Sequence, residues 1–154
     1  MNLFANAGNE YRDDKIVNVA SIPQRSPFRY PGGKTWLVPT VRRWLRTRKF
    51  KELIEPFAGG GIISLTAAFE ELVDRVTMVE FDSQVAAVWE TIFNGGHQRL
   101  AERIVNFEMT AENVKAVLSK VDVSREELAF QTILRNRVNH GGILAPGVGV
   151  SLAG

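Results

Sequence analysis

The stretch Glu55-Pro-Phe-Ala-Gly-Gly-Gly61 decides the fold of this 154-residue chain, because it separates an expected strand from an expected helix. The strand is expected at residues 50–54 and the helix at residues 62–72. A glycine turn between a strand and a helix N-terminus lets a cofactor lie against bare backbone N–H groups. The stretch therefore predicts an α/β fold with a cofactor site at the turn.

A second buried strand is expected at residues 76–79, and an acidic residue follows it directly. Glu80 lies about 20 residues beyond the glycines, the separation at which a carboxylate can accept hydrogen bonds from ribose hydroxyls. Asp82 is open to two interpretations: it points to the same site, or it favours the N-terminus of the following helix. Glycine turns are often tight packing only, but the turn and Glu80 together favour a nucleoside cofactor.

Helical periodicity accounts for most of the remaining chain. A helix is expected from Thr35, as N-cap, to about residue 49, with Pro39 in its first turn. Ser83 is expected to cap the next helix, which the glycines at 95 and 96 end. Further helices are expected at about 98–105, 110–119 and 124–139, the last with a capping box that begins at Ser124. The order strand, helix, strand, helix indicates a parallel sheet.

Composition limits the classes of protein. Hydrophobic residues make up 45% and charged residues 23%, as in globular proteins, and no apolar run approaches the ~20 residues of a membrane span. Without cysteine, and with only two histidines, neither a disulfide nor a metal site is expected. The N-terminus lacks the features of a signal peptide, so we expect a cytoplasmic protein without a membrane partner.

The charge is unevenly distributed. Between residues 25 and 51 there are nine Lys/Arg and no Asp/Glu, although the net charge is only +2. Such a run indicates either a solvated helix face or an anionic partner.

The segment Pro31-Gly-Gly-Lys-Thr35 ends like a nucleotide-triphosphate loop. That loop requires a glycine at position 28, where this chain has Phe28. The alternatives left are a plain turn and a ligand-binding role for Lys34, whose ammonium can reach a carboxylate or a phosphate.

Three motifs together resemble the N-terminal half of the Dam-like N6-adenine DNA methyltransferases, in order and in spacing. They are Arg29-Tyr-Pro-Gly-Gly-Lys34, Glu55-Pro-Phe-Ala-Gly-Gly-Gly61 and Val79-Glu-Phe-Asp82. Asn136-Arg137 followed by Gly141-Gly142-Ile143 is similar to a later stretch of the family. The resemblance covers roughly residues 27–145. It implies part of a Rossmann-like S-adenosylmethionine-dependent methyltransferase fold, followed by a mostly helical start of the target-recognition region.

The resemblance also implies residue roles. Contacts with S-adenosylmethionine are implied for Tyr30, Lys34, Pro56, Phe57, Ala58, Gly59, Gly61, Glu80 and Phe81. Contacts with double-stranded DNA are implied for Arg29, Asn136, Arg137, Asn139 and His140. Glu80 stands where the family usually has Asp. His140 and Ala145 stand where some members have an aromatic and a basic residue, so the target sequence cannot be transferred.

The family's Asp-Pro-Pro-Tyr tetrapeptide, which holds the target adenine, has no counterpart here, because the sequence contains no Pro-Pro pair. No catalytic residue is therefore expected in this chain. We expect residues 1–26 to form an arm, 27–95 the cofactor-binding portion and 96–154 the truncated start of the DNA-recognition region. This would be the cofactor-binding portion of a site-specific, restriction–modification-type enzyme.

Such a portion would be inactive alone and would need a second chain or a missing C-terminal half that carries the tetrapeptide. Two other functions remain open. One is a non-enzymatic DNA-binding module that uses the basic run, and the other is a fragment of an NAD-binding oxidoreductase.

Overall fold

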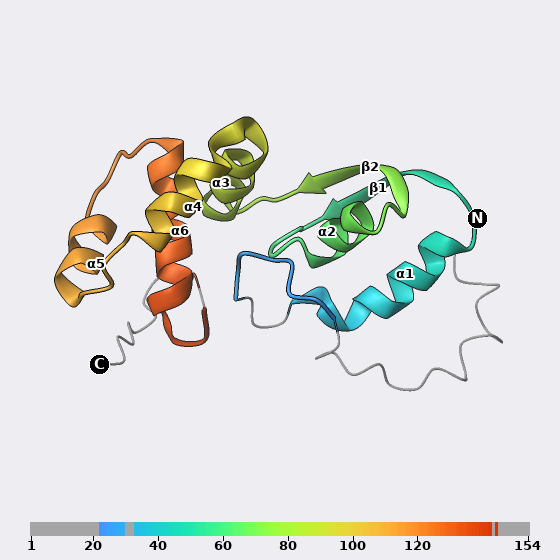
Figure 1. Cartoon of the computed structure of the whole chain (residues 1–154), viewed down its shortest axis with the longest axis horizontal. Coiled ribbons are helices and arrows are strands. Elements are labelled where there is room, and N and C mark those ends of the chain that lie inside the picture. Colours follow the sequence, from blue (N-terminus) through green and yellow to red (C-terminus); the bar gives the residue numbers. More distant parts are fainter. Residues whose placement is uncertain (1–21, 30–32, 143, 145–154) are drawn as a thin grey trace.

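The computed structural model describes residues 22–29, 33–142 and 144, and its elements form two halves at opposite ends of the molecule (Figure 1). The α/β half comprises α1 (Val38–Arg46), β1 (Phe50–Pro56), α2 (Ile62–Phe69) and β2 (Val73–Val79). The helical half comprises α3 (Ser83–Thr91), α4 (His97–Val105), α5 (Ala111–Leu118) and α6 (Arg125–Val138). Shorter helical turns occupy Lys34–Leu37, Ile92–Gly96 and His140–Gly142.

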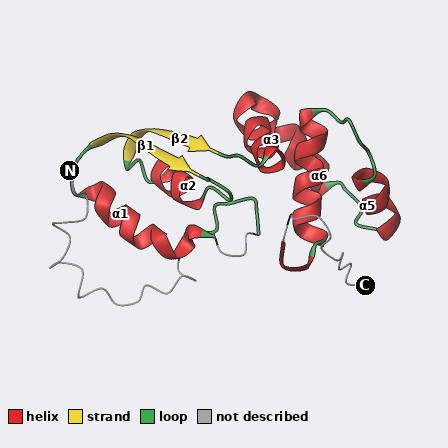
Figure 2. Ribbon diagram, turned by 180° about the vertical axis from the view of Figure 1, so that it is seen from behind, coloured by secondary structure: helices red, strands yellow, loops and turns green. Residues whose placement is uncertain are grey.

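The two strands form a small parallel sheet, which confirms the expected mixed α/β order. Their register pairs Leu53 with Val76 and Pro56 with Val79. Helix α2 packs against both strands and α1 packs on α2, so both helices lie on one side of the sheet (Figure 2). Because side chains alternate along a strand, Leu53 faces α2 and is buried, whereas Ile54 faces away and is 58% exposed.

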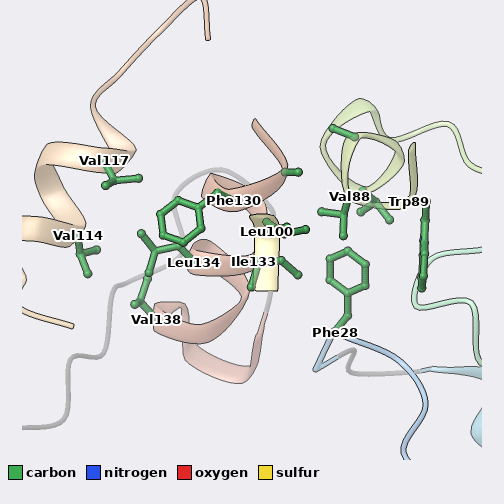
Figure 3. Close-up of a cluster of buried hydrophobic side chains, with 13 residues drawn as sticks. Phe28, Val88, Trp89, Leu100, Val114, Val117, Phe130, Ile133, Leu134 and Val138 are labelled. Carbon is green, nitrogen blue, oxygen red and sulfur yellow. The ribbon is translucent and has the colours of Figure 1, made fainter. Parts of the chain in front are cut away.

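Each half has its own apolar core. The α/β cluster consists of Ile22, Val38, Leu45, Leu53, Ile62, Ile63 and Ala67. The larger helical cluster is shown in Figure 3 and is built from α3 to α6 together with Phe28. Among the described residues, no helix is both long enough and apolar enough to cross a membrane.

Residues 22–29, called here the bridge segment, lie between the two halves (Figure 1). Ile22 belongs to the α/β cluster, and the Arg25 guanidinium pairs with Glu70 at the end of α2, 2.9 Å from Nη1 to Oε1. Phe28 instead belongs to the helical cluster, where its ring meets Trp89 edge-on at 5.8 Å between centroids (Figure 3). The bridge segment is thus anchored to both cores.

Two expected helix caps are wrong. Thr35 lies inside the Lys34–Leu37 turn, because the Pro39 ring lacks an N–H and clashes with the carbonyl one turn before it, so a tighter turn precedes α1. Asp82, not Ser83, caps α3: its Oδ1 accepts hydrogen bonds from the N–H groups of Gln84 at 2.8 Å and Val85 at 3.4 Å. The helix-capping interpretation of Asp82 is therefore confirmed.

The expected Ser124 cap of α6 is confirmed, whereas the Glu127 side chain of the expected capping box pairs with Arg103 and Lys120 instead. The Ser124 hydroxyl accepts the Glu127 N–H at 3.2 Å. The Glu127 carboxylate pairs with Arg103 of α4, whose hydrogen bond holds the pKa of Glu127 below its ordinary value. This pair ties α4 to the start of α6.

Candidate cofactor site

A cavity of about 970 Å³ opens at the carboxyl ends of β1 and β2, within the size range of small-molecule sites. One wall is the glycine loop, residues 57–61, and another is the bridge segment; Arg137 reaches it from α6. The complete lining is Gln24, Ser26, Phe28, Arg29, Gly33, Lys34, Thr35, Phe57, Ala58, Gly59, Gly60, Gly61, Ile62, Glu80 and Arg137.

The glycine loop adopts left-handed backbone conformations that its glycines permit. Gly59 has φ 53° and Gly61 has φ 63°, and Phe57 shares this region at φ 55° and is 78% exposed. A Cβ on Gly61 would lie 2.6 Å from the Met78 Cε atom and 2.9 Å from the Trp89 ring. Glycine at position 61 is therefore favoured by φ and by packing, chiefly against the rigid Trp89 ring.

Glu80 fastens the glycine loop to the end of β2. Its Oε2 accepts the Gly59 N–H at 2.5 Å, and its Oε1 accepts the Asp82 N–H at 2.9 Å. From the other side, the Trp89 indole donates to the Gly59 carbonyl at 2.8 Å. Because each carboxylate oxygen can accept a second hydrogen bond, Glu80 can hold the loop and still accept ligand hydroxyls.

Lys34 is held by the end of β1. Its Nζ lies 2.8 Å from Glu55 Oε1 and donates to the Phe57 carbonyl at 2.6 Å. The other oxygen of Glu55 accepts the Ser64 N–H at 2.9 Å and its hydroxyl at 2.6 Å. Since an ammonium has three N–H donors, the contacts within the described residues leave one N–H of Lys34 for a ligand.

Glu55 and Trp89 are site-supporting residues that sequence reasoning missed. The signal for Glu55 was available. Side chains alternate along a strand, so Glu55 shares the inward face with Leu53, and its carboxylate is expected to be buried. A buried charge needs a partner, and Lys34 supplies it. Trp89 carried no such signal, because its approach to Gly59 arises from the packing of α3.

Two arginines line the cavity on the side of the helical half. Arg137 donates from Nη2 to the Pro27 carbonyl at 2.9 Å. Burial, and secondarily the charge of Arg29, lowers the pKa of the Arg137 guanidinium. Two cations at one cavity edge favour an anionic group beside them.

The remaining residues singled out from the sequence lie elsewhere. Pro56 and Phe81 are outside the cavity lining, and Phe81 is 95% exposed. Tyr30 lies outside the described residues. Asn139 and His140 follow α6 and do not line the cavity.

Asn136 is buried, and all of its amide groups are used within the protein. Its Oδ1 accepts the Arg29 N–H, and its Nδ2 donates to the carbonyls of Arg29 and Gly142, each at 2.8 Å. This places Asn136 between the bridge segment and the turn after α6, with its polar atoms turned to backbone.

Part of the basic run between residues 25 and 51 is neutralised inside the molecule. Arg25, Arg42 and Arg46 converge on Glu70, with Arg42 Nη2 2.6 Å from Oε1. The hydrogen bond from Arg42 holds the pKa of Glu70 below its ordinary value. Lys49 lies 3.7 Å from Asp74. The run therefore presents less free charge than its sequence indicates.

Comparison with known proteins places the chain, including most of the residues around the cavity, in a family. The family described as D12 class N6 adenine-specific DNA methyltransferase matches residues 30–137, more than half of the chain. The chain belongs to this family. The match confirms the resemblance drawn from the motifs, and it spans both the glycine loop and most of α6. The chain thus carries a domain of this family.

A relative of this chain is the DNA N-6-adenine-methyltransferase of Escherichia phage P1. It is 36% identical over 64 residues, which cover 42% of this chain and 8% of the phage protein. The chain therefore matches only a small part of that relative's length. No solved structure matches the chain significantly.

Proposed function

We propose that this chain is the S-adenosylmethionine-binding portion of a DNA adenine-N6 methyltransferase, built on a Rossmann-like frame. One observation carries the proposal: the acid at the end of β2 is hydrogen-bonded to the glycine loop at the end of β1, and both line one cavity. This is the arrangement in which a parallel α/β sheet binds a nucleoside cofactor.

The residues present fit this cofactor. Glu80 has lone pairs for the ribose hydroxyls, and Lys34 has an N–H for the carboxylate of the methionine part. The loop from Phe57 to Gly61 exposes backbone beside them, with Phe81 and Pro56 at the strand ends. When bound, S-adenosylmethionine supplies an electrophilic methyl group. The described residues bind and orient it, and Tyr30 is proposed as a further contact from the sequence.

We propose double-stranded DNA as the partner on the side of the helical half. Arg29 and Arg137 line the cavity edge there, and Asn139 and His140 follow α6 on the same side. Because the Asn136 amide is already hydrogen-bonded to backbone, the neighbouring residues Arg137, Asn139 and His140 would make the direct contacts with DNA. The division into an arm to residue 26, a cofactor-binding portion to 95 and a recognition segment beyond is retained as part of this proposal.

We further propose that the groups that hold the adenine come from a second polypeptide segment, so that this chain alone does not methylate. The described residues leave one face of the sheet uncovered, which supports this, because parallel sheets are normally covered on both faces. Ile54 is 58% and Val79 is 50% exposed on that face. Transfer of a methyl group to DNA by the purified polypeptide would contradict this part of the proposal.

Thermal unfolding tests the cofactor assignment. S-adenosylmethionine should raise the Tm of the wild-type chain, since a ligand that binds only the folded state stabilises it. NAD should leave the Tm unchanged. Glu80→Ala should abolish the rise in Tm with S-adenosylmethionine. Glu102→Ala, at an exposed position of α4, should preserve it. A larger response to NAD would favour the oxidoreductase alternative, and steeply salt-dependent DNA binding without any cofactor response would favour a DNA-binding module.

A further inference from the structure

We infer that Asn136 is a positioning residue that holds the bridge segment, and with it one wall of the cavity, against the end of α6. The inference starts from its hydrogen bonds. Asn136 is 1% exposed, and its oxygen and both N–H protons are bonded to backbone at 2.8 Å. Two of these bonds go to the N–H and the carbonyl of Arg29, 107 positions earlier in the chain.

The attachment lies directly behind the cavity. Gln24, Ser26, Phe28 and Arg29 of the bridge segment all line it. Within the described part of the chain, Phe28 is the apolar anchor of this segment on the helical half, and Asn136 is a buried polar anchor beside the more exposed Arg137 bond to the Pro27 carbonyl. A shift of Arg29 away from α6 would therefore move a wall of the cavity.

Gly142 completes the attachment. Its carbonyl accepts from Asn136, its φ is +71°, and a Cβ there would lie 2.4 Å from the Arg29 carbonyl oxygen. The turn after α6 is thus in close contact with the same backbone group that Asn136 holds. A displacement of this turn would therefore shift the backbone group that Asn136 holds, so the segment proposed to face DNA and the cavity wall share one attachment point. The consequence for cofactor affinity rests on the proposed function; the attachment itself does not.

A matched control exists on the same helix. Gln131 is also 1% exposed and also spends its amide on backbone, donating to the carbonyls of Val117 at 2.9 Å and Lys120 at 3.1 Å. It does not line the cavity. Gln131→Ala therefore removes a comparable buried amide without touching the bridge segment.

The test compares Asn136→Ala, Asn136→Asp and Gln131→Ala in the whole chain. Amide hydrogen exchange is followed at Arg29 and Phe28, whose N–H groups bond to Asn136 and to Ser26, and S-adenosylmethionine affinity is measured by calorimetry. Asn136→Ala should speed exchange at both amides and weaken S-adenosylmethionine binding on the order of tenfold. Asn136→Asp retains the acceptor for the Arg29 N–H but loses both donors. Exchange of the Arg29 amide should therefore be faster than in the wild type and slower than in Asn136→Ala. Gln131→Ala should change neither readout.

The outcomes that would overturn the inference are specific. Unchanged exchange at Arg29 and Phe28 in both Asn136 variants would overturn the inference, and so would equal effects of Gln131→Ala. If Asn136→Ala does not fold, Asn136→Asp and Gly142→Ala carry the same comparison. If the wild-type chain binds no cofactor while the Asn136 variants lose protection selectively, the proposed function fails and the positioning role stands.

Discussion

The α/β half and the helical half are stabilised in different ways. The helical half encloses a core in which α3, α4, α5 and α6 cover one another. The α/β half has a smaller core and, among the described residues, a two-stranded sheet that is covered on one side only. Isolated two-stranded sheets are marginally stable, yet this half carries the glycine loop and Glu80. The site is thus placed on the less enclosed half and depends on polar contacts and on the bridge segment to keep its shape.

Removing the apolar link between the halves should have the largest effect. Phe28 is buried in the helical cluster although it precedes the α/β half in the chain. Phe28→Ala should lower the free energy of unfolding by about 3–5 kcal/mol, the usual cost of truncating a buried aromatic residue. Denaturant titration measures this. Phe81→Ala, at a residue that is 95% exposed, should change it by less than about 0.5 kcal/mol. Equal losses would mean that the bridge segment does not join the halves.

Breaking the Lys34–Glu55 pair should weaken the α/β half next. Lys34→Met leaves the buried Glu55 carboxylate without its cation. Because Lys34 itself is partly exposed, we expect a loss of about 2–3 kcal/mol, somewhat below the cost of breaking a fully buried pair. Lys51→Met, at an exposed position of β1, should be neutral in the same denaturation assay. A neutral Lys34→Met would show that water replaces the ammonium and that Glu55 does not depend on it.

The Glu70 cluster should contribute less and should do so in a pH-dependent way. The hydrogen bond from Arg42, opposed by burial and aided by Arg25, lowers the pKa of Glu70 in the folded state. A lowered folded-state pKa gives stability that is present above the ordinary value of 4.5 and is lost as pH falls through the folded-state pKa. Glu70→Gln should therefore cost about 1–2 kcal/mol at pH 7.

The difference between wild type and Glu70→Gln should shrink when unfolding is measured well below pH 4. Glu102→Gln, at an exposed acid of the helical half, should show no such trend. A difference that stays constant with pH would assign the cost of Glu70→Gln to packing and not to charge.

The halves also differ in how far sequence predicts them. In the α/β half, period-two and helical patterns predict local elements, so the strands, the glycine turn and the acid after β2 were found. The expected caps at Thr35 and Ser83 are wrong because of neighbouring residues. Pro39 shifts the start of α1, and Asp82 caps α3 in place of Ser83. The helices of the other half were predicted as elements, but their packing was not.

Contacts between distant residues could not be predicted. Nothing in the sequence near Asn136 indicates that its amide reaches Arg29, because the bond depends on how the bridge segment crosses between two cores. The same holds for Trp89 at Gly59. Charge counting overstated the free charge of the basic run for a related reason: the acids that neutralise some of its arginines come from other segments, such as Glu70 at the end of α2.

The central claim is that the cavity at the ends of β1 and β2 binds S-adenosylmethionine through the glycine loop and Glu80. Calorimetric titration of the folded wild-type chain with S-adenosylmethionine tests it most directly, with Glu80→Gln titrated beside it. The account predicts saturable 1:1 binding that is weakened at least about tenfold in Glu80→Gln, since that variant loses the charged acceptor. Absence of binding to a chain that circular dichroism shows to be folded, or equal affinities for the two proteins, would contradict it.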